Sequence, residues 1–340
     1  MPPKDDDADE DLRWSIEAHL EFLAAAANTL DFADGRQSAT AEAYVGQLLA
    51  VEQHCDVISS SSSSHAASIV ELAVDTTAKV KHLPTLVMEA WCRVASTALA
   101  NRLCCAEEND RVTMILPRLL SRLADAVKSL SKDRNDASIT TACALDAALR
   151  LLTSLLSVLL SVPSTTPSFA GLVDACLTSA STTTGVLPIL ASSQLPHPAK
   201  SISVAPRISA MSLTSLLIDG AGRRGQSVKR LRSIGAPTTT NAPALLLTAH
   251  RRKQNAPRWL STTQPTVIGA TSVFPLEWIV YIRKGIEGKD FSVKEAALQA
   301  LADSLWVAAL PESQLSWVLE LIGKAVDAPV TSARILSSSS

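Results

Sequence analysis

The sequence predicts an all-α protein in which pairs of helices stack side by side into an elongated α-solenoid, interrupted by one long basic loop. Apolar residues recur every three or four positions through most of the 340-residue chain, which is the spacing of an amphipathic helix. The segment DFSVKEAALQAL, residues 290–301, is partly echoed 37 residues later. The echoed positions are Asp290, Val293 and Ala296, with counterparts Asp327, Val330 and Ala333. A recurrence of this length is typical of stacked helical repeats.

Composition agrees with a helical protein inside the cell. Hydrophobic residues make up 47% of the chain, but aromatic residues only 4% and charged residues only 19%, against about 25% charged in an average domain. The longest apolar run, residues 151–162, is too short for a bilayer span of about 20 residues and ends at Pro163. It therefore predicts a buried core helix, and no membrane partner is expected. The acidic start, MPPKDDDADED, is unlike a secretory signal.

The six cysteines predict neither disulfides nor a metal site. They form no Cys-x-x-Cys pair, and most lie in helical patterns rich in Ala and Leu. Such cysteines are typical of small buried apolar residues in a reducing compartment. The expected location is the cytoplasm, the nucleus or both, and no cofactor is expected. The six are Cys55, Cys92, Cys104, Cys105, Cys143 and Cys176.

An acidic tail, residues 1–10, precedes a helical repeat region, residues 11–219. Apolar stripes predict helices near residues 12–30, 39–57, 65–81, 84–105, 110–130, 136–159, 168–179 and 208–219. The serine run 59–64 is expected to form a mobile loop. Asn109 or Asp110 is expected to cap the fifth helix, and Pro117 inside that helix is expected to bend it.

The character of the sequence changes between residues 220 and 274. Gly, Pro, Ser and Thr accumulate, and the segment carries nine basic residues and no acidic residue. It is predicted to be a basic, partly disordered insertion. Its cations are candidates for nuclear import or nucleic-acid contact. They are Arg223, Arg224, Lys229, Arg230, Arg232, Arg251, Arg252, Lys253 and Arg258.

A resemblance appears after the insertion. One helix is predicted from Pro275 to about Ile286, and a second from Phe291 to about Ala308. The motif of the second helix resembles the HEAT/armadillo-type repeat, with Lys294 in place of the usual Arg. The matching positions are Asp290, Val293, Lys294, Ala296, Ala297, Ala300 and Leu301.

The resemblance implies that residues 275–340 are HEAT-like repeats, the last one incomplete, within a superhelix that binds proteins. A helix from Pro311 is expected to follow. Its inner face would carry Leu315, Val318, Leu319, Ile322 and Val326.

Two further residue patterns do not predict a cofactor site or a metal site. Gly220, Gly222 and Gly225 form a GxGxxG pattern, but no acidic residue follows about 20 residues on, as a dinucleotide-binding fold requires. A flexible Gly/Arg loop is the favoured interpretation. Neighbours such as His54 and Cys55 point about 100° apart on a helix, so they grip a shared metal ion poorly.

No coherent catalytic set is present, so the sequence predicts a noncatalytic scaffold or adaptor for other proteins rather than an enzyme. The alternative is a nuclear or RNA-associated assembly factor that contacts nucleic acid through residues 223–258.

Overall fold

The computed structural model describes residues 16–26, 38–61, 63–79, 83–105, 110–132, 139–161, 172, 175–176, 195–198, 203–225, 276–307 and 316–321. Every regular element in these ranges is a helix, so the all-α prediction is confirmed for the described part of the chain. The longer helices are α2 (Ser38–Ser61), α3 (Ser63–Lys79), α4 (Thr85–Cys105), α5 (Arg111–Lys132), α6 (Ile139–Ser161), α9 (Val204–Gly225), α12 (Leu276–Ile286) and α13 (Phe291–Val307).

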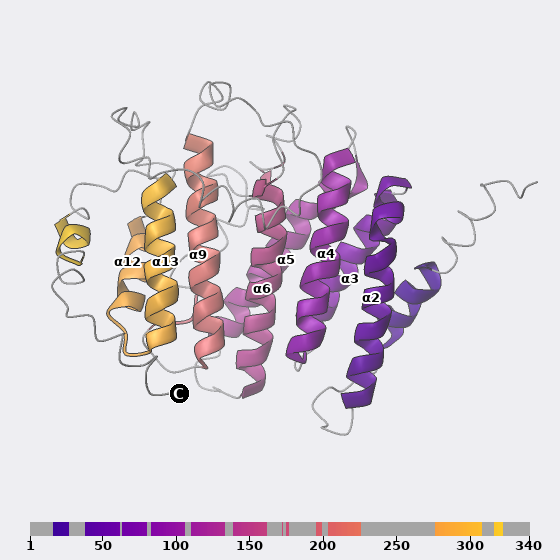
Figure 1. Cartoon of the computed structure of the whole chain (residues 1–340), viewed down its shortest axis with the longest axis horizontal. Helices are drawn as coiled ribbons and strands as arrows, with labels where there is room; N and C mark the ends of the chain where they lie inside the picture. Colours follow the sequence, from indigo (N-terminus) through magenta and orange to yellow (C-terminus); the bar gives the residue numbers. More distant parts are fainter. Residues whose placement is uncertain are drawn as a thin grey trace, which may run out of the picture.

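The helices lie in two rows. Helices α2, α4, α6, α9 and α13 stand side by side in the front row, and α3, α5 and α12 lie behind them (Figure 1). Each helix of the front row contacts the next one, and α3 and α5 contact each other and helices of the front row. We call the five helices α2, α4, α6, α9 and α13 the front row.

Pairs of contacts show that neighbours in the front row run in the same direction. Glu89 of α4 pairs with Arg150 of α6, and three residues later Cys92 contacts Ser154. Both contacts advance along the two helices together, which requires parallel axes. At the far end, Arg207 of α9 pairs with Asp290 just before α13. Gly285 lies between Met211 of α9 and Ala297 of α13, so α9 and α13 also advance together.

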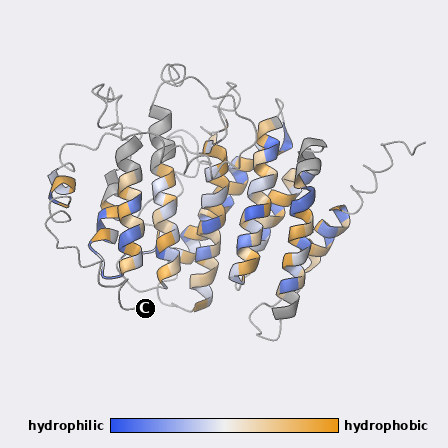
Figure 2. Ribbon diagram, in the orientation of Figure 1, coloured by the Kyte–Doolittle hydropathy of each residue, from blue (hydrophilic) through white to orange (hydrophobic). Residues whose placement is uncertain are grey.

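One continuous apolar core runs between the rows. Its largest fully buried side chain is Trp91 of α4, which meets Tyr44 of α2 edge-on, with ring centroids 6.3 Å apart. Helix α6 lies near the middle and contacts α3, α4, α5 and α9. Apolar residues predominate along α6, while apolar and polar residues are interspersed on its neighbours in the front row (Figure 2).

Helix α6 is long and apolar enough to cross a membrane, but 67% of its most apolar window is buried inside the protein. Its buried residues include every member of the stripe that the sequence indicated. The helix packs on several sides, which explains why it needs so few polar residues. The prediction of a buried core helix in this region is confirmed. These stripe residues are Leu145, Leu149, Leu152, Leu156 and Leu159.

The predicted start of α5 has a clear local cause. The Asp110 carboxylate accepts a hydrogen bond from the backbone nitrogen of Val112 at 2.9 Å, which satisfies a free donor in the first turn of α5. The Asp110 carbonyl also accepts a hydrogen bond from the Met114 nitrogen at 3.1 Å, the first bond of that helix. The predicted cap is therefore Asp110, and Pro117 lies inside α5 as expected.

Two loop predictions are wrong. The serine run, expected to be a loop, is helical through Ser61 in α2 and again from Ser63 in α3. Serine disfavours a helix by only about half a kcal/mol relative to alanine, which flanking helices outweigh. Helix α9 continues to Gly225, so the three glycines of the GxGxxG pattern are helical instead of forming a flexible loop.

The C-terminal pair agrees with its prediction more closely. Helices α12 and α13 contact each other, and a tight turn joins them in which the Gly288 nitrogen donates to the Gly285 carbonyl at 3.2 Å. In the short helix 316–321, Val318 is buried as expected. Leu319 is 60% exposed, so its assignment to the inner face is wrong, because it lies one position from Val318 and therefore about 100° round the helix.

Candidate functional site

A series of polar contacts links each helix of the front row to the next. We call this series the polar ladder. Each step joins side chains from two helices that are neighbours in space but not in sequence. The four steps are Glu52 to Arg93, Glu89 to Arg150, Asp146 to Ser209 and Arg207 to Asp290.

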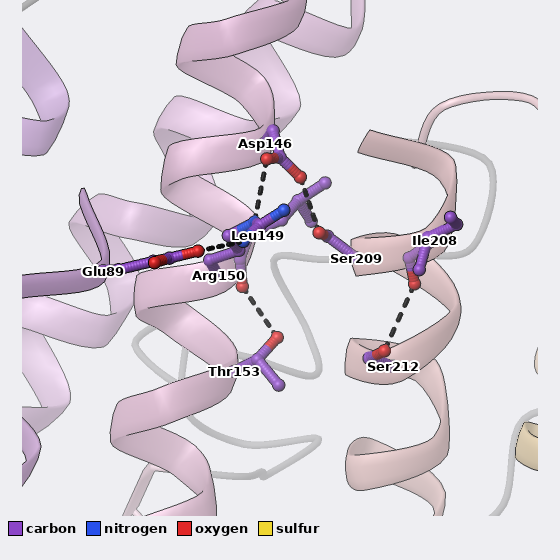
Figure 3. A network of polar contacts seen from close by, with 8 residues as sticks. All are labelled: Glu89, Asp146, Leu149, Arg150, Thr153, Ile208, Ser209 and Ser212. Carbon is purple, nitrogen blue, oxygen red and sulfur yellow. Dashed lines mark hydrogen bonds and ion pairs between the residues drawn. The ribbon is translucent and has the colours of Figure 1, made fainter. Parts of the chain in front are cut away.

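The middle of the ladder lies where α4, α6 and α9 meet (Figure 3). The Arg150 side chain lies between two carboxylates, with Nε 2.8 Å from Asp146 Oδ2 and Nη1 3.6 Å from Glu89 Oε1. Asp146 also accepts a hydrogen bond from the Ser209 hydroxyl at 2.6 Å. One carboxylate therefore serves both its own helix and α9, so α4, α6 and α9 are held in register.

Two hydroxyls in the same view satisfy backbone carbonyls of their own helices. Thr153 donates to the Leu149 carbonyl at 2.7 Å, and Ser212 donates to the Ile208 carbonyl at 3.2 Å. Figure 3 also shows α6 and α9 descending together, from Asp146 to Thr153 and from Ile208 to Ser212. Such back-bonding lets serine and threonine remain in helix interiors. The hydroxyls of these two residues are therefore hydrogen-bonded within the helices that carry the ladder.

In the last step of the ladder, the arginine is buried and its aspartate partner is partly exposed. Arg207 is only 4% exposed, and its Nη1 lies 2.6 Å from Asp290 Oδ2 and donates to the Pro198 carbonyl at 3.0 Å. Next to it, the Tyr281 hydroxyl donates to the Pro196 carbonyl at 2.6 Å. We call Arg207, Tyr281 and Asp290 the clasp. The clasp holds the short segment 195–198 together with α9, α12 and the start of α13.

Burial makes the clasp different from the rest of the ladder. The Arg93 side chain is 56% exposed and that of Glu89 is 58% exposed, so water screens their pairs. Exposed ion pairs contribute about 0 to 1 kcal/mol each. Burial raises the pKa of Tyr281 well above its ordinary value, although the nearby Arg207 charge opposes this shift. Tyr281 is therefore a neutral hydrogen-bond donor at physiological pH.

Polar contacts also hold the second row. Arg122 of α5 pairs with Asp75 of α3 at 2.6 Å, and Arg102 at the end of α4 pairs with the buried Asp110. The helix 16–26 is joined to α2 by a contact of 2.5 Å between His19 and Gln47. These contacts hold the helices together and leave the outward side chains of the front row accessible.

The described residues offer little reactive chemistry. Among them, no group of three or more His, Cys, Asp or Glu side chains could hold a metal ion. Burial raises the pKa of the Cys92 thiol to about 11, and a hydrogen bond from the Ser154 side chain only partly offsets this. A thiol with such a pKa is protonated at neutral pH and is a poor nucleophile. Cys55 is also buried, beside the half-buried His54.

Most of the basic candidates from the sequence lie outside the described residues. Arg223 and Arg224 fall in the last turns of α9. The other seven, Lys229, Arg230, Arg232, Arg251, Arg252, Lys253 and Arg258, lie in the part of the chain that the structure does not describe. Nuclear import and nucleic-acid contact by these residues therefore stay predictions.

The sequence alone did not predict the clasp. One signal was available: Arg207 is the only charged residue between Lys200 and Asp219, and it lies in an apolar helical stretch. A lone charge in such a stretch needs a buried partner. The partner, 83 residues further along the chain, could not be identified from spacing. In the sequence, Asp290 stood out only as part of the repeat-like motif of residues 290–301.

Comparison of the chain with protein-family models, with curated proteins and with solved structures finds no match. Its function must therefore be argued from its own geometry.

Proposed function

We propose that this protein is a noncatalytic scaffold or adaptor, an α-solenoid of HEAT/armadillo-like helical hairpins that binds other proteins. One observation carries the proposal: the polar ladder joins each of the five helices of the front row to the next one in space. Repeat proteins are built in this way, because each unit contacts mainly its neighbours and the stack forms an extended surface. Such an architecture serves recognition by shape and charge over a long face.

The outward side of the front row is the proposed binding face. Its central side chains are half-exposed and charged, and ion pairs between helices already hold several of them in place. The Arg150 side chain is 38% exposed between two acidic partners, and the Arg93 and Glu89 side chains are exposed on α4. Preordered side chains lose little conformational entropy when a partner binds. A partner with both acidic and basic side chains would complement this face.

The buried groups support a structural role instead of a catalytic one. The thiols of Cys92 and Cys176 and the phenols of Tyr44 and Tyr281 all have pKa values that burial raises above their ordinary values. Buried groups that stay neutral strengthen packing and hydrogen bonding without supplying a nucleophile or a base. The proposed location of the protein is the cytoplasm, the nucleus or both.

The test is capture of partners by the full chain, followed by mapping. Proteins retained on the immobilised chain are identified and cross-linked, and the cross-links are located. The variant Arg93→Glu reverses a charge on the front row, while Arg118→Glu reverses one on α5, in the second row. We expect Arg93→Glu to weaken capture by tenfold or more and Arg118→Glu to leave capture unchanged.

The helical circular dichroism of both variants should match that of the natural chain. Equal effects of the two charge reversals would contradict the proposed face. Failure to retain any protein above an unrelated bait would contradict the scaffold itself. RNA binding that disappears when residues 226–260 are deleted would favour the alternative function.

A further inference from the structure

The segment 195–198, with sequence Leu-Pro-His-Pro, lies on the surface formed by α9 and α12 as a peptide ligand would lie. Leu195 is 3% exposed and belongs to the apolar core. The carbonyls of Pro196 and Pro198 accept hydrogen bonds from Tyr281 and Arg207, respectively. Tyr281 lies 85 residues from Pro196 in the chain, whereas Arg207 lies nine residues from Pro198. The segment is therefore held by one long-range contact and by one contact to the helix that follows it.

The chemistry of the clasp matches a proline-containing peptide. At these two positions the clasp supplies donors, a phenol hydroxyl and a guanidinium, while each proline supplies a carbonyl and has no backbone N–H. An ordinary residue would bring an N–H that needs its own acceptor in a buried place. Proline also restricts the chain to an extended form before binding, which lowers the entropy lost.

The clasp also retains an unused donor. Arg207 is 4% exposed, and its Nε has no hydrogen-bond partner. A buried donor without an acceptor is costly. The resident segment therefore leaves one donor of the clasp unsatisfied, and a ligand with a further acceptor would satisfy it.

We propose that the clasp is a binding site for Pro-x-Pro segments of partner proteins, and that residues 195–198 are a built-in occupant which a partner segment displaces. This inference names a partner class for the proposed scaffold and rests on that function. Exchange of the occupant would couple partner binding to the packing of α12 and α13 on α9, since the same Arg207 side chain contacts both the segment and Asp290.

The experiment removes the resident segment from the clasp by mutation and then tests whether an added peptide binds in its place. The resident segment is replaced in the full chain by the variant Leu195→Gly/Pro196→Ser/His197→Gly/Pro198→Ser. A fluorescent synthetic peptide with the sequence of residues 192–200, SSQLPHPAK, is then titrated into this variant, and anisotropy is measured. A second peptide carries alanine in place of both prolines. We expect saturable binding of the proline peptide, about tenfold or more tighter than that of the alanine peptide.

The two tyrosines of the chain provide a matched pair of controls. In the emptied chain, Tyr281→Phe removes the donor to the Pro196 carbonyl and should weaken peptide binding about fivefold. Tyr44→Phe makes the same chemical change in α2, where the hydroxyl donates to the Leu23 carbonyl, and should leave peptide binding unchanged. If the fourfold variant loses its helical circular dichroism, the milder Leu195→Gly/Pro198→Gly variant is titrated instead.

Equal affinity for the proline and alanine peptides would overturn the proposed site, and so would absence of binding in a folded variant. Either result would leave the scaffold proposal standing, because capture of partners by the front row is measured separately. Peptide binding without any captured partner would instead contradict the scaffold and keep the peptide site.

Discussion

Asp290→Asn is expected to destabilise the packing of α13 on α9 more than Arg207→Met does. Asparagine suits a helix start as well as aspartate does, but the variant removes the negative charge opposite Arg207, which is 4% exposed. A charge-assisted hydrogen bond contributes about 1.5 to 3 kcal/mol, and stranding a buried charge costs about 3 to 5 kcal/mol. The Asp290 side chain is 42% exposed, so water screens the pair. A loss of about 2 kcal/mol follows.

The methionine variant removes the buried charge itself. Asp290 can then turn toward water, and the main loss is the donor to the Pro198 carbonyl, which costs about 1 kcal/mol. The double variant should cost no more than Arg207→Met alone, because a neutral amide no longer faces a stranded cation. The two single effects are therefore expected to be strongly non-additive.

Native-state hydrogen exchange of the α13 amides measures this difference, because local opening reports local stability. Exchange should accelerate about thirtyfold in Asp290→Asn and about fivefold in Arg207→Met. Amides of α4 serve as an internal reference. Arg93→Met, which breaks an exposed pair of the same ladder, is the matched control and should change exchange by no more than about twofold. Equal effects of the two clasp variants, adding in the double variant, would refute the buried-charge reasoning.

Three further predictions follow from the packing. A methyl group at Gly285 would lie 2.9 Å from the Ala297 methyl and 2.5 Å from Met211 Cε, so Gly285→Ala should lower the free energy of unfolding by about 1 kcal/mol. A methyl group at Gly46 would meet no atom within 4 Å, so Gly46→Ala should raise the free energy of unfolding by up to about 1 kcal/mol. Urea melts of the two variants measure this difference. Burial raises the pKa of Tyr44 to about 12, above its unfolded value of 10.0, so its contribution to stability is complete below pH 10 and is lost as pH rises toward 12. Tyrosinate absorbance should therefore appear together with loss of helical circular dichroism, and its appearance in a fully folded chain at pH 10 would contradict burial of the two tyrosines. Asp110→Ala should destabilise the α4–α5 junction by about 2 to 4 kcal/mol, while Asp110→Asn keeps the cap and should cost less in thermal melts.

Local features of the sequence predicted the helices well. The apolar stripe predicted for α5 is buried except at its last member, Leu130, which is partly buried, and Asp110 caps that helix. The buried members are Val112, Leu116, Leu119, Leu123 and Val127. Periodicity and capping act over only a few residues, so they can be recognised in a short stretch of sequence. The turn between α12 and α13 was located for the same reason.

Local features failed where packing outweighed propensity. The serine run and the three glycines of the GxGxxG pattern have modest or poor helix propensity, yet they lie in helices. Neighbouring turns that bury apolar side chains extend a helix through such residues at small cost. The exposure of Leu319 shows the reverse case, in which an apolar residue faces outward.

For the part of the chain that the structure describes, the sequence by itself determined that it is helical and where most of its helices begin, because those properties depend on residues three or four positions apart. Only the tertiary structure decided which helices became neighbours and which charges met. The Arg207 and Asp290 side chains are 83 residues apart in the chain and 2.6 Å apart in space. Their pairing depends on how whole helices pack, and no short-range pattern records that arrangement.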